Sequence, residues 1–291
     1  MQKITPCLWL DNNVEDAISF YSSGFKNTKV KLKTYYGEAA SQAAGQKIGD
    51  LLTALVEIEG KEFLFLNGGP HFKPTPCNSF FITCENEKEI DGLWEKLSQG
   101  GEVRIPLQKY PFAEKYGWCE DRFGFSWQLI IGSSKDKISP AFLFANKNFG
   151  KAEEAMKLYT SLFKNSKIEI VARDEKSNAI LHAKFTLAGE PLYVMEGPLE
   201  HHFEFNPAVS MVVKCDTQNE IDAVWAKLSA NKDFEQCGWL QDKFGISWQI
   251  VPTGLEAMLT DPNPERRERV TAAVMKMKKL DLASLEKAFG K

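Results

Sequence analysis

The N-terminal part of the chain switches between two hydrophobic periods. Pro6–Leu10 is a short apolar run typical of a strand, whereas Val14–Ser22 repeats its apolar residues every three or four positions, as a helix does. Gly24 provides an end for that helix. The turn Glu59-Gly60-Lys61 predicts a hairpin. Further strands are predicted at residues 30–36, 52–59 and 62–66. Together these segments make one β-α-β-β-β unit.

The same order of periods then returns. Ser79–Cys84 is predicted as a strand, and Glu87–Leu97 as a helix with one apolar face. The turn Asp121-Arg122-Phe123-Gly124 precedes the last strand of this stretch, because Asp and Gly favour turns. The strands after the helix are predicted at residues 103–107, 117–120 and 125–131. This half of the chain therefore holds two units.

The second half of the chain repeats the first. Gly117–Leu129 returns as Gly238–Ile250, with substitutions that keep size and polarity. Glu89–Leu97 likewise corresponds to Glu220–Leu228, and the order of matching segments is preserved. A repeat of this length predicts two copies of one fold, and so four units in all. We expect the first domain at residues 1–134 and the second at residues 135–254.

Residues 255–291 lie outside the repeat and predict a helical tail. Asn263 before Pro264 is a good helix start, since Asn caps the helix and Pro presets the backbone of its first turn. Asp281 can cap a second helix. We expect the tail to dock on the body or on a neighbouring subunit. DNA binding by its basic residues is disfavoured because acidic residues interleave with them.

The composition fits a folded protein without a strong electrostatic field. The 291 residues are 43% hydrophobic, 12% aromatic and carry a net charge of -3. This balance argues against a nucleic-acid or membrane partner, and no apolar run is long enough to span a membrane. The N-terminus lacks the apolar core of a signal peptide. The six cysteines include no Cys-x-x-Cys pair. We therefore expect a cytoplasmic protein whose cysteines are reduced.

The repeated units resemble the vicinal oxygen chelate superfamily of glyoxalase I and bleomycin-resistance proteins, in particular its PhnB-like (demethylubiquinone methyltransferase-like) branch. Pro6–Leu10, Phe20-Tyr21 with Phe25, and the block from Asp121 to Gln128 carry the likeness, as do their counterparts in the second copy. The resemblance implies an α+β fold in which two units curl a mixed sheet into a cup with helices outside. It also implies that the fused copies form an intramolecular pseudo-dimer; a further homodimer stays open.

Strand parity selects the side chains that face into each cup. Phe125, Trp127 and Leu129 share one face of the closing strand and are expected to pack against the helices. Gln128, and Gln249 in the second copy, then point into the cups. Metal-dependent members that this chain resembles have a glutamate at that position. A neutral amide offsets the dehydration of a divalent cation poorly.

The other expected ligand positions offer no charged side chain in the first copy and a single one, Glu196, in the second. The resemblance aligns them with Asn67 and Glu196 on the fourth strands and with Ser79 and Ser210 on the fifth. We therefore predict no metal and no cofactor, and we expect these four residues and the two glutamines to contact a small, partly hydrophobic ligand.

Histidines leave a catalytic alternative open. His182 begins a strand and could face the second cup as a proton acceptor, although a hydrogen-bonded place at a strand edge fits it as well. His201-His202 lies in a loop that we expect to be solvated. The floor of the second copy carries Glu196 and His182, so we expect the second copy to be the better binding site.

Three functions remain compatible with the sequence. The first is a protein that binds a small molecule in one or both cups. The second is a glyoxalase-like lyase or isomerase that acts from the second cup through His182 or Glu196. The third is an interaction module whose cups are filled. No Gly-x-Gly-x-x-Gly follows a predicted strand, so the sequence shows no methyltransferase cofactor loop. Phosphate-binding and nucleophile-elbow motifs are also absent from the sequence.

Overall fold

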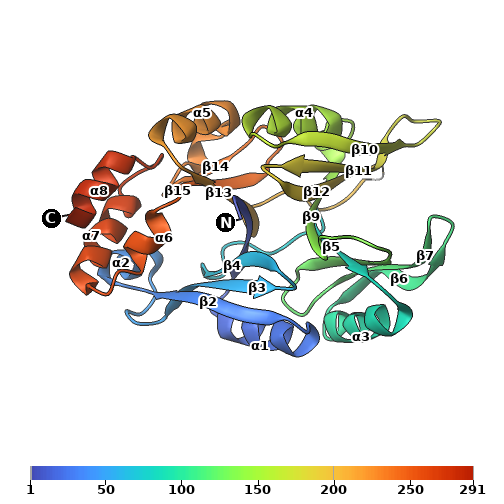
Figure 1. Ribbon diagram of the computed structural model, residues 1–291, viewed down its shortest axis with the longest axis horizontal. Helices are drawn as coiled ribbons and strands as arrows, with labels where there is room; N and C mark the ends of the chain where they lie inside the picture. The colour runs from blue at the N-terminus through green and yellow to red at the C-terminus, as the bar shows by residue number, and fades with distance from the viewer. Residues whose placement is uncertain (1, 199, 291) are drawn as a thin grey trace.

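The computed structural model describes residues 2–198 and 200–290, which form two mixed sheets with helices on their outer faces (Figure 1). The seven-stranded sheet has the order β14-β15-β13-β1-β4-β3-β2. Its strands are β1 (Ile4–Leu10), β2 (Thr28–Tyr35), β3 (Leu51–Ile58), β4 (Lys61–Asn67), β13 (Val209–Cys215), β14 (Trp239–Gln241) and β15 (Ser247–Pro252).

The eight-stranded sheet has the order β10-β11-β12-β9-β5-β8-β7-β6. Its strands are β5 (Asn78–Cys84), β6 (Glu102–Tyr110), β7 (Ala113–Glu120), β8 (Ser126–Ile131), β9 (Ile138–Ala145), β10 (Lys167–Arg173), β11 (Ile180–Leu187) and β12 (Glu190–Gly197). The helices are α1 (Val14–Gly24), α2 (Glu38–Ala44), α3 (Glu87–Ser98), α4 (Ala152–Leu162), α5 (Gln218–Leu228), α6 (Leu255–Leu259), α7 (Pro264–Met275) and α8 (Leu282–Gly290). The predicted α+β fold with a helical tail is confirmed.

Each sheet combines strands from both copies of the repeat. The first unit (β1–β4) joins the fourth (β13–β15) through antiparallel pairing of β1 with β13. The second unit (β5–β8) joins the third (β9–β12) through antiparallel pairing of β5 with β9. The units therefore pair as first with fourth and second with third, and each cup draws on both halves of the sequence.

The main core lies between the sheets and the outer helices, as strand parity predicts. Trp127 and Trp248 are both 0% exposed and pack against α1 and α4 respectively. Tyr21 on α1 donates a hydrogen bond of 2.6 Å to Asp121, and the Trp127 indole donates one of 2.8 Å to the same carboxylate. The second copy repeats this three-residue bracket with Tyr159, Asp242 and Trp248. Each bracket ties the helix of one unit to the closing strand of the next.

Two helices, α2 and the short α6, were not predicted from the sequence. The segment between β2 and β3 contains α2, which begins after Gly37 and ends before Gly45, where φ is +68°. The corresponding segment of the second copy, between β10 and β11, has no helix. Alanine favours this helix, yet it is too short to show the apolar periodicity of a longer one.

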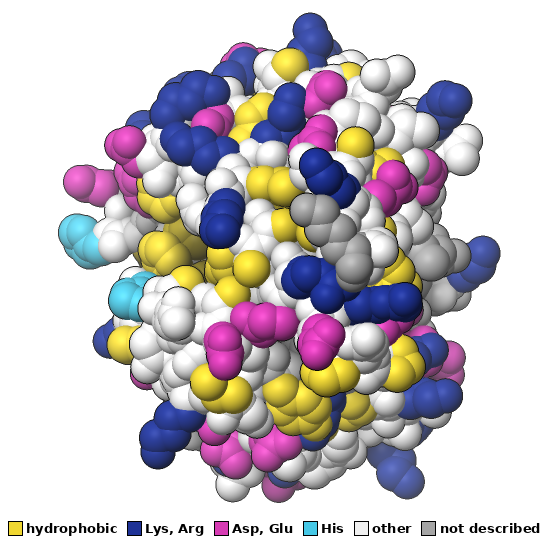
Figure 2. Space-filling view, turned by 90° about the vertical axis from the view of Figure 1, so that its left-hand side faces the viewer, with side chains coloured by type: hydrophobic (Ala, Val, Ile, Leu, Met, Phe, Trp, Pro, Cys, Tyr) yellow, Lys and Arg dark blue, Asp and Glu magenta, His cyan; other side chains and the backbone are white. Residues whose placement is uncertain are grey.

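The C-terminal tail packs beside α2 at one end of the molecule (Figure 1). Leu255, Val270, Leu280 and Leu285 form its own small core. Among the described residues no helix is long and apolar enough to cross a membrane. The face at this end carries basic and acidic side chains interspersed with apolar ones (Figure 2), rather than a field of one sign.

Candidate functional site

The inner face of the seven-stranded sheet borders a cavity of about 980 Å³. We call it the roofed cavity, because α2 and α7 contribute to its lining opposite the sheet. Trp9, Leu66 and Trp239 line it from the strands, and Thr271 and Met275 line it from α7. Most of the other lining side chains are also apolar. The cavity thus takes its sheet face from the first and fourth units and its cover from segments outside the repeat.

Aromatic rings dominate the sheet side of the roofed cavity. Trp9 makes edge contacts with Phe72 at 5.0 Å and with Trp239 at 6.0 Å between ring centroids. The Trp9 indole N–H donates to the carbonyl of Gly69 at 2.8 Å, which fixes that ring. The Trp239 indole N–H has no hydrogen-bond partner among the described residues. It is therefore a donor that a bound molecule could use.

The predicted glutamine and serine meet beneath these rings. Gln249 lies directly opposite Trp239 in the β14–β15 ladder, and its side-chain amide donates to Ser210 Oγ at 3.0 Å. Cys7 on β1 contacts the same two side chains, and burial raises the pKa of its thiol to about 12. A thiol this far from ionisation is a poor nucleophile at neutral pH. The base of this cup is a neutral hydrogen-bonded cluster.

The other cup has the same base but a different filling. Gln128 donates to Ser79 Oγ at 2.8 Å, and its carbonyl oxygen accepts from the Tyr116 hydroxyl at 2.6 Å. Phe81 packs on Tyr116 and on Tyr193, so aromatic rings occupy the inner face of the eight-stranded sheet. We call this the aromatic cup.

His182 lies in the aromatic cup. Its ring contacts Tyr193 at 4.9 Å and Phe81 at 5.7 Å between centroids, and burial lowers its pKa. Because the third unit pairs with the second, His182 shares its cup with Gln128 rather than with Gln249. The ring is held by packing, in a place where the neutral imidazole is favoured.

Asn67 and Glu196 face the helices, contrary to the expectation that they line the cups. The side-chain oxygen of Asn67 accepts from the backbone N–H of Val14 at 3.1 Å, at the start of α1. Glu196 does the same for Ala152 at the start of α4, at 3.0 Å, and its second oxygen accepts from Ile180 at 2.8 Å. Both side chains therefore satisfy free N–H groups at helix starts.

This position also separates the suggested catalytic pair. Glu196 has the parity of Leu192 and Val194, which belong to the main core, whereas His182 packs on the inner face. The two side chains lie on opposite faces of one sheet and cannot act on one molecule. The helix-facing direction of Asn67 could have been predicted from the alternation of residues along its strand. Phe63 and Phe65 precede Asn67 at alternate positions and belong to the core beneath the helices.

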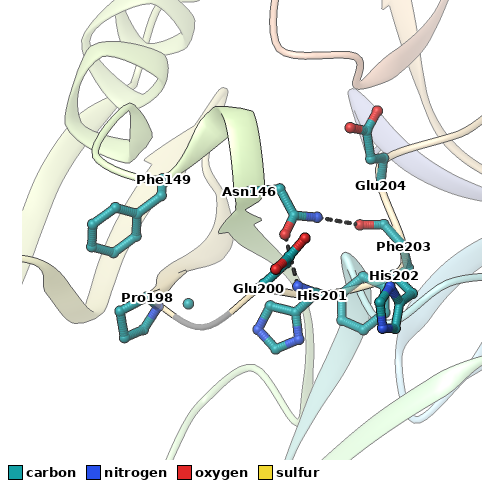
Figure 3. Close-up of a pocket in the computed structure, with 9 residues that line it drawn as sticks. Asn146, Phe149, Pro198, Glu200, His201, His202, Phe203 and Glu204 are labelled. Atoms are coloured by element: carbon teal, nitrogen blue, oxygen red, sulfur yellow. Dashed lines mark hydrogen bonds between the residues drawn. The ribbon is translucent and has the colours of Figure 1, made fainter.

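A second, shallower pocket lies in the loop after β12 (Figure 3). It measures about 610 Å³ and includes the predicted loop histidines, His201 and His202. Asn146 holds the loop: its side chain accepts from the His201 backbone N–H at 2.8 Å and donates to the Phe203 carbonyl at 2.9 Å. The His201 ring stacks on Phe203 at 4.8 Å. These contacts order the loop without bringing the two imidazoles into a donor cluster with a third ligand.

Comparison with protein families agrees with this architecture. The model of the 3-demethylubiquinone-9 3-methyltransferase family matches residues 2–130 and again residues 136–251. The chain belongs to this family. It holds two family domains in tandem, followed by the helical tail. No curated protein matches the chain.

Several solved structures are similar to this family member. A PhnB protein from Bacillus cereus is 36% identical over 45% of this chain and 100% of that one, with a TM-score of 0.41. A protein from Pseudomonas aeruginosa is 21% identical over 46% of this chain and 100% of that one, with a TM-score of 0.39. A glyoxalase I variant from Zea mays is 12% identical, covers 86% of this chain and 94% of its own, and has a TM-score of 0.56. The maize enzyme shows that the tandem fold is shared.

The donor sets of this family member do not suit a glyoxalase-type cation. The base of one cup offers Cys7, Ser210 and Gln249, and that of the other offers Ser79 and Gln128 beside Ala141. Neither set contains a carboxylate or an imidazole, which divalent ions need to offset dehydration. Within residues 2–198 and 200–290, no three His, Cys, Asp or Glu side chains gather as ligands.

Proposed function

We propose that this protein binds one small, largely apolar molecule with an aromatic group in the roofed cavity. The observation that carries the proposal is the contrast between two cups with the same base: one borders a cavity of about 980 Å³, and the other is occupied by its own aromatic side chains. Ligand sites commonly measure about 300–1,000 Å³ and have mostly apolar walls with a few polar groups.

The chemistry of the walls supports an aromatic ligand. Trp9, Phe72 and Trp239 offer ring faces and edges, and aromatic pairs contribute about 0.5–1.5 kcal/mol beyond the area that they bury. The free N–H of Trp239, which lines the cavity, can orient a bound molecule. The charged side chains in the lining balance, with Lys33 and Arg267 against Asp233 and Glu268, so a neutral or weakly polar molecule fits better than a strongly ionic one.

The position of the cavity differs from the expectation that the second copy is the better binding site. Its walls come from β1–β4 and β13–β15, so the better site does not belong to the second copy alone. Of the seven residues that were expected to line the cups, Gln249 and Ser210 belong to the sheet that borders this cavity and bond to each other there.

A filled-cavity variant tests the proposal. Thr271 lines the cavity from α7, so Thr271→Trp should occupy space that the ligand needs. Thr160→Trp is a matched control, because both threonines are half-buried in helices and both hydroxyls bond to the carbonyl four residues earlier. Binding of N-phenyl-1-naphthylamine, a neutral fluorescent probe, and of a panel of neutral aromatic compounds would be measured by titration and by thermal shift.

We expect wild type and Thr160→Trp to bind at least one compound equally, and Thr271→Trp to bind it at least tenfold more weakly. Binding that survives in Thr271→Trp contradicts the proposal, as does the absence of any binding to the wild type.

A further inference from the structure

Two segments that have no counterpart in the other copy of the repeat meet above the roofed cavity. α2 is present in the first copy and missing from the equivalent place in the second, and α7 belongs to the tail. Both helices contribute lining residues, among them Ala40 from α2 and Thr271 from α7. Figure 1 shows α2 beside α7 at the end of the molecule where the seven-stranded sheet lies. The opposite end, with the aromatic cup, has neither helix.

One carboxylate joins the two helices. Glu268 on α7 accepts a hydrogen bond of 2.6 Å from the backbone N–H of Ala39, in the first turn of α2. Gly37, which precedes α2, has no side chain to cap the helix. A Cβ at this position would lie 2.1 Å from Glu268 Oε2, so the glycine makes room for the carboxylate. The cap of α2 therefore comes from a residue 229 positions further along the chain.

The tail is fixed to the body mainly at its other end. The backbone N–H groups of Cys237 and Gly238 donate to the carbonyls of Met277 and Lys278 at 2.8 and 2.7 Å. Gln218 bonds to the backbone of both Leu280 and Leu282. All three of these partners in the body belong to the fourth unit. Of the hydrogen bonds between described residues, the one from Ala39 to Glu268 alone ties the tail to the first unit.

We propose that α2 and α7 form a two-part lid on the roofed cavity and that Glu268 is its latch. The inference rests on the proposed function, because the lid controls access to that same site. The fourth-unit attachment serves as the fixed end, and rupture of the latch lets α2 and the N-terminal half of α7 separate. A ligand enters and leaves through the gap that opens.

The energetics suit a reversible latch. A helix as short as α2 is marginal by itself and depends on its contacts. Loss of a helix N-cap changes helix stability by an amount that corresponds to about 2- to 30-fold in an equilibrium constant. The closed form thus gains a preference from Glu268 that thermal fluctuation can still overcome.

A single thiol reports on the lid. Cys237 lines the roofed cavity and is half-buried, whereas the other five cysteines are fully buried, at 2% exposure or less. The rate at which N-ethylmaleimide modifies Cys237 in the folded full-length protein, followed by mass spectrometry, therefore measures access to the cavity. Cys237→Ser identifies the signal.

Three variants separate the latch from general destabilisation. Glu268→Ala removes the cap. Gly37→Ser supplies α2 with a cap of its own and displaces Glu268, so that the helix is kept and the link to α7 is lost. Glu286→Gln on α8 is the control, since its exposed side chain has no partner among the described residues. Circular dichroism checks that each variant is folded.

We expect Glu268→Ala and Gly37→Ser to raise the labelling rate of Cys237 by about 2- to 30-fold, and Glu286→Gln to leave it unchanged. Amide exchange at residues 39–44 should rise in Glu268→Ala but not in Gly37→Ser. Labelling rates equal to wild type in both latch variants would overturn the lid.

The proposed function can fail separately in this assay. Saturating N-phenyl-1-naphthylamine, a neutral aromatic probe, should slow the labelling of Cys237 in wild type by filling the cavity. Faster labelling of the latch variants without such protection keeps the lid and rejects ligand binding at this site. Protection together with unchanged rates in the latch variants rejects the lid and keeps the site.

Discussion

The two cups of this protein share a frame and differ in their cover. In both, a glutamine amide donates to a serine hydroxyl at the base, and a Tyr–Asp–Trp bracket holds the outer face. The aromatic cup is then filled by Phe81, Tyr116 and Tyr193. The other cup keeps its volume beneath α2 and α7. The repeat thus determines the scaffold, and the two segments without a repeat counterpart cover the cup that keeps a cavity.

The difference begins with the length of one strand. β7 runs from Ala113 to Glu120 and brings Tyr116 over the base of its cup. Its counterpart β14 has only three residues, Trp239–Gln241, because the tight turn at Cys237, with φ of 54°, comes just before it. No tyrosine can therefore reach Gln249 from that strand.

The largest effect should be shared by both halves. Asp121 accepts four hydrogen bonds, from Tyr21, Trp127 and the N–H groups of Phe123 and Phe125. Asp121→Asn turns one acceptor into a donor, so buried donors lose their partner. We expect a loss of about 2–3 kcal/mol in the free energy of unfolding, measured in urea, and a similar loss for Asp242→Asn. The exposed Asp11→Asn should change little. A loss in one half only would break the equivalence of the two frames.

The pH dependence of Asp121→Asn sharpens this test. Burial raises the pKa of Asp121 to about 6, above its usual value of 3.8. Between these values the folded state binds more protons than the unfolded state, so ionisation of this group costs stability as pH rises. When the pH is lowered from 7 to 5, the free energy of unfolding of the wild type should therefore rise relative to that of Asp121→Asn. A difference in unfolding free energy that stays constant or shrinks contradicts the raised pKa.

Binding should distinguish the two cups where stability does not. Trp239 and Trp118 occupy equivalent ladder positions opposite Gln249 and Gln128. Trp239→Ala removes a wall of the roofed cavity and should weaken the binding of an aromatic probe about tenfold, or about 1.4 kcal/mol. Trp118→Ala is the matched control and should leave the dissociation constant unchanged. Equal effects of the two substitutions in a fluorescence titration would place ligands in both cups.

His182 gives the aromatic cup a pH response of its own. Burial lowers its pKa below the usual 6.5, so the unfolded state binds the proton more readily than the folded state. Stability is therefore lost as pH falls below about 6.5. His182→Phe keeps a ring between Phe81 and Tyr193 and should flatten this decline in unfolding midpoints between pH 7 and 5. A steeper decline in the variant would show that the imidazole is charged in the fold.

The smallest effect concerns two hydroxyls. Ser126 and Ser247 are 1% and 2% exposed, and neither hydroxyl has a hydrogen-bond partner among the described residues. Ser126→Ala and Ser247→Ala should be neutral or stabilising by up to about 1 kcal/mol, because each removes a buried polar atom that lacks a partner. Destabilisation of Ser247→Ala alone, in thermal unfolding, would reveal a bonded group in that cup.

Much of the frame can be predicted from the sequence, since local signals determine it. The repeat, the helix and strand types, the burial of Trp127 and the inward direction of Gln128 all follow from periodicity. The pairing of the first unit with the fourth does not, because four similar units can pair in several ways. Nor does the sequence reveal that Phe81 and His182, from different copies, fill one cup.

The roof is less predictable for a related reason. α2 is too short to show a clear apolar periodicity. Its cap, Glu268, is one of several glutamates in the tail, and nothing in the sequence marks it as the capping residue. Asn67 and Glu196 are different: alternation along their strands indicates the helix-facing side, but alignment to metal-dependent relatives suggests the inner one. Parity within a strand is the more reliable guide, because it follows directly from backbone geometry.

The nested pairing of the strands also sets the order in which the chain can acquire structure during synthesis. Residues 78–197 contain every strand of the eight-stranded sheet, so that sheet can close while the ribosome is still adding the remainder. The earliest strands, β1–β4, must wait for β13–β15 before β1 is paired on both sides. During this interval one apolar strand edge is open to other nascent chains, and protection of that edge would be the point at which chaperones matter most.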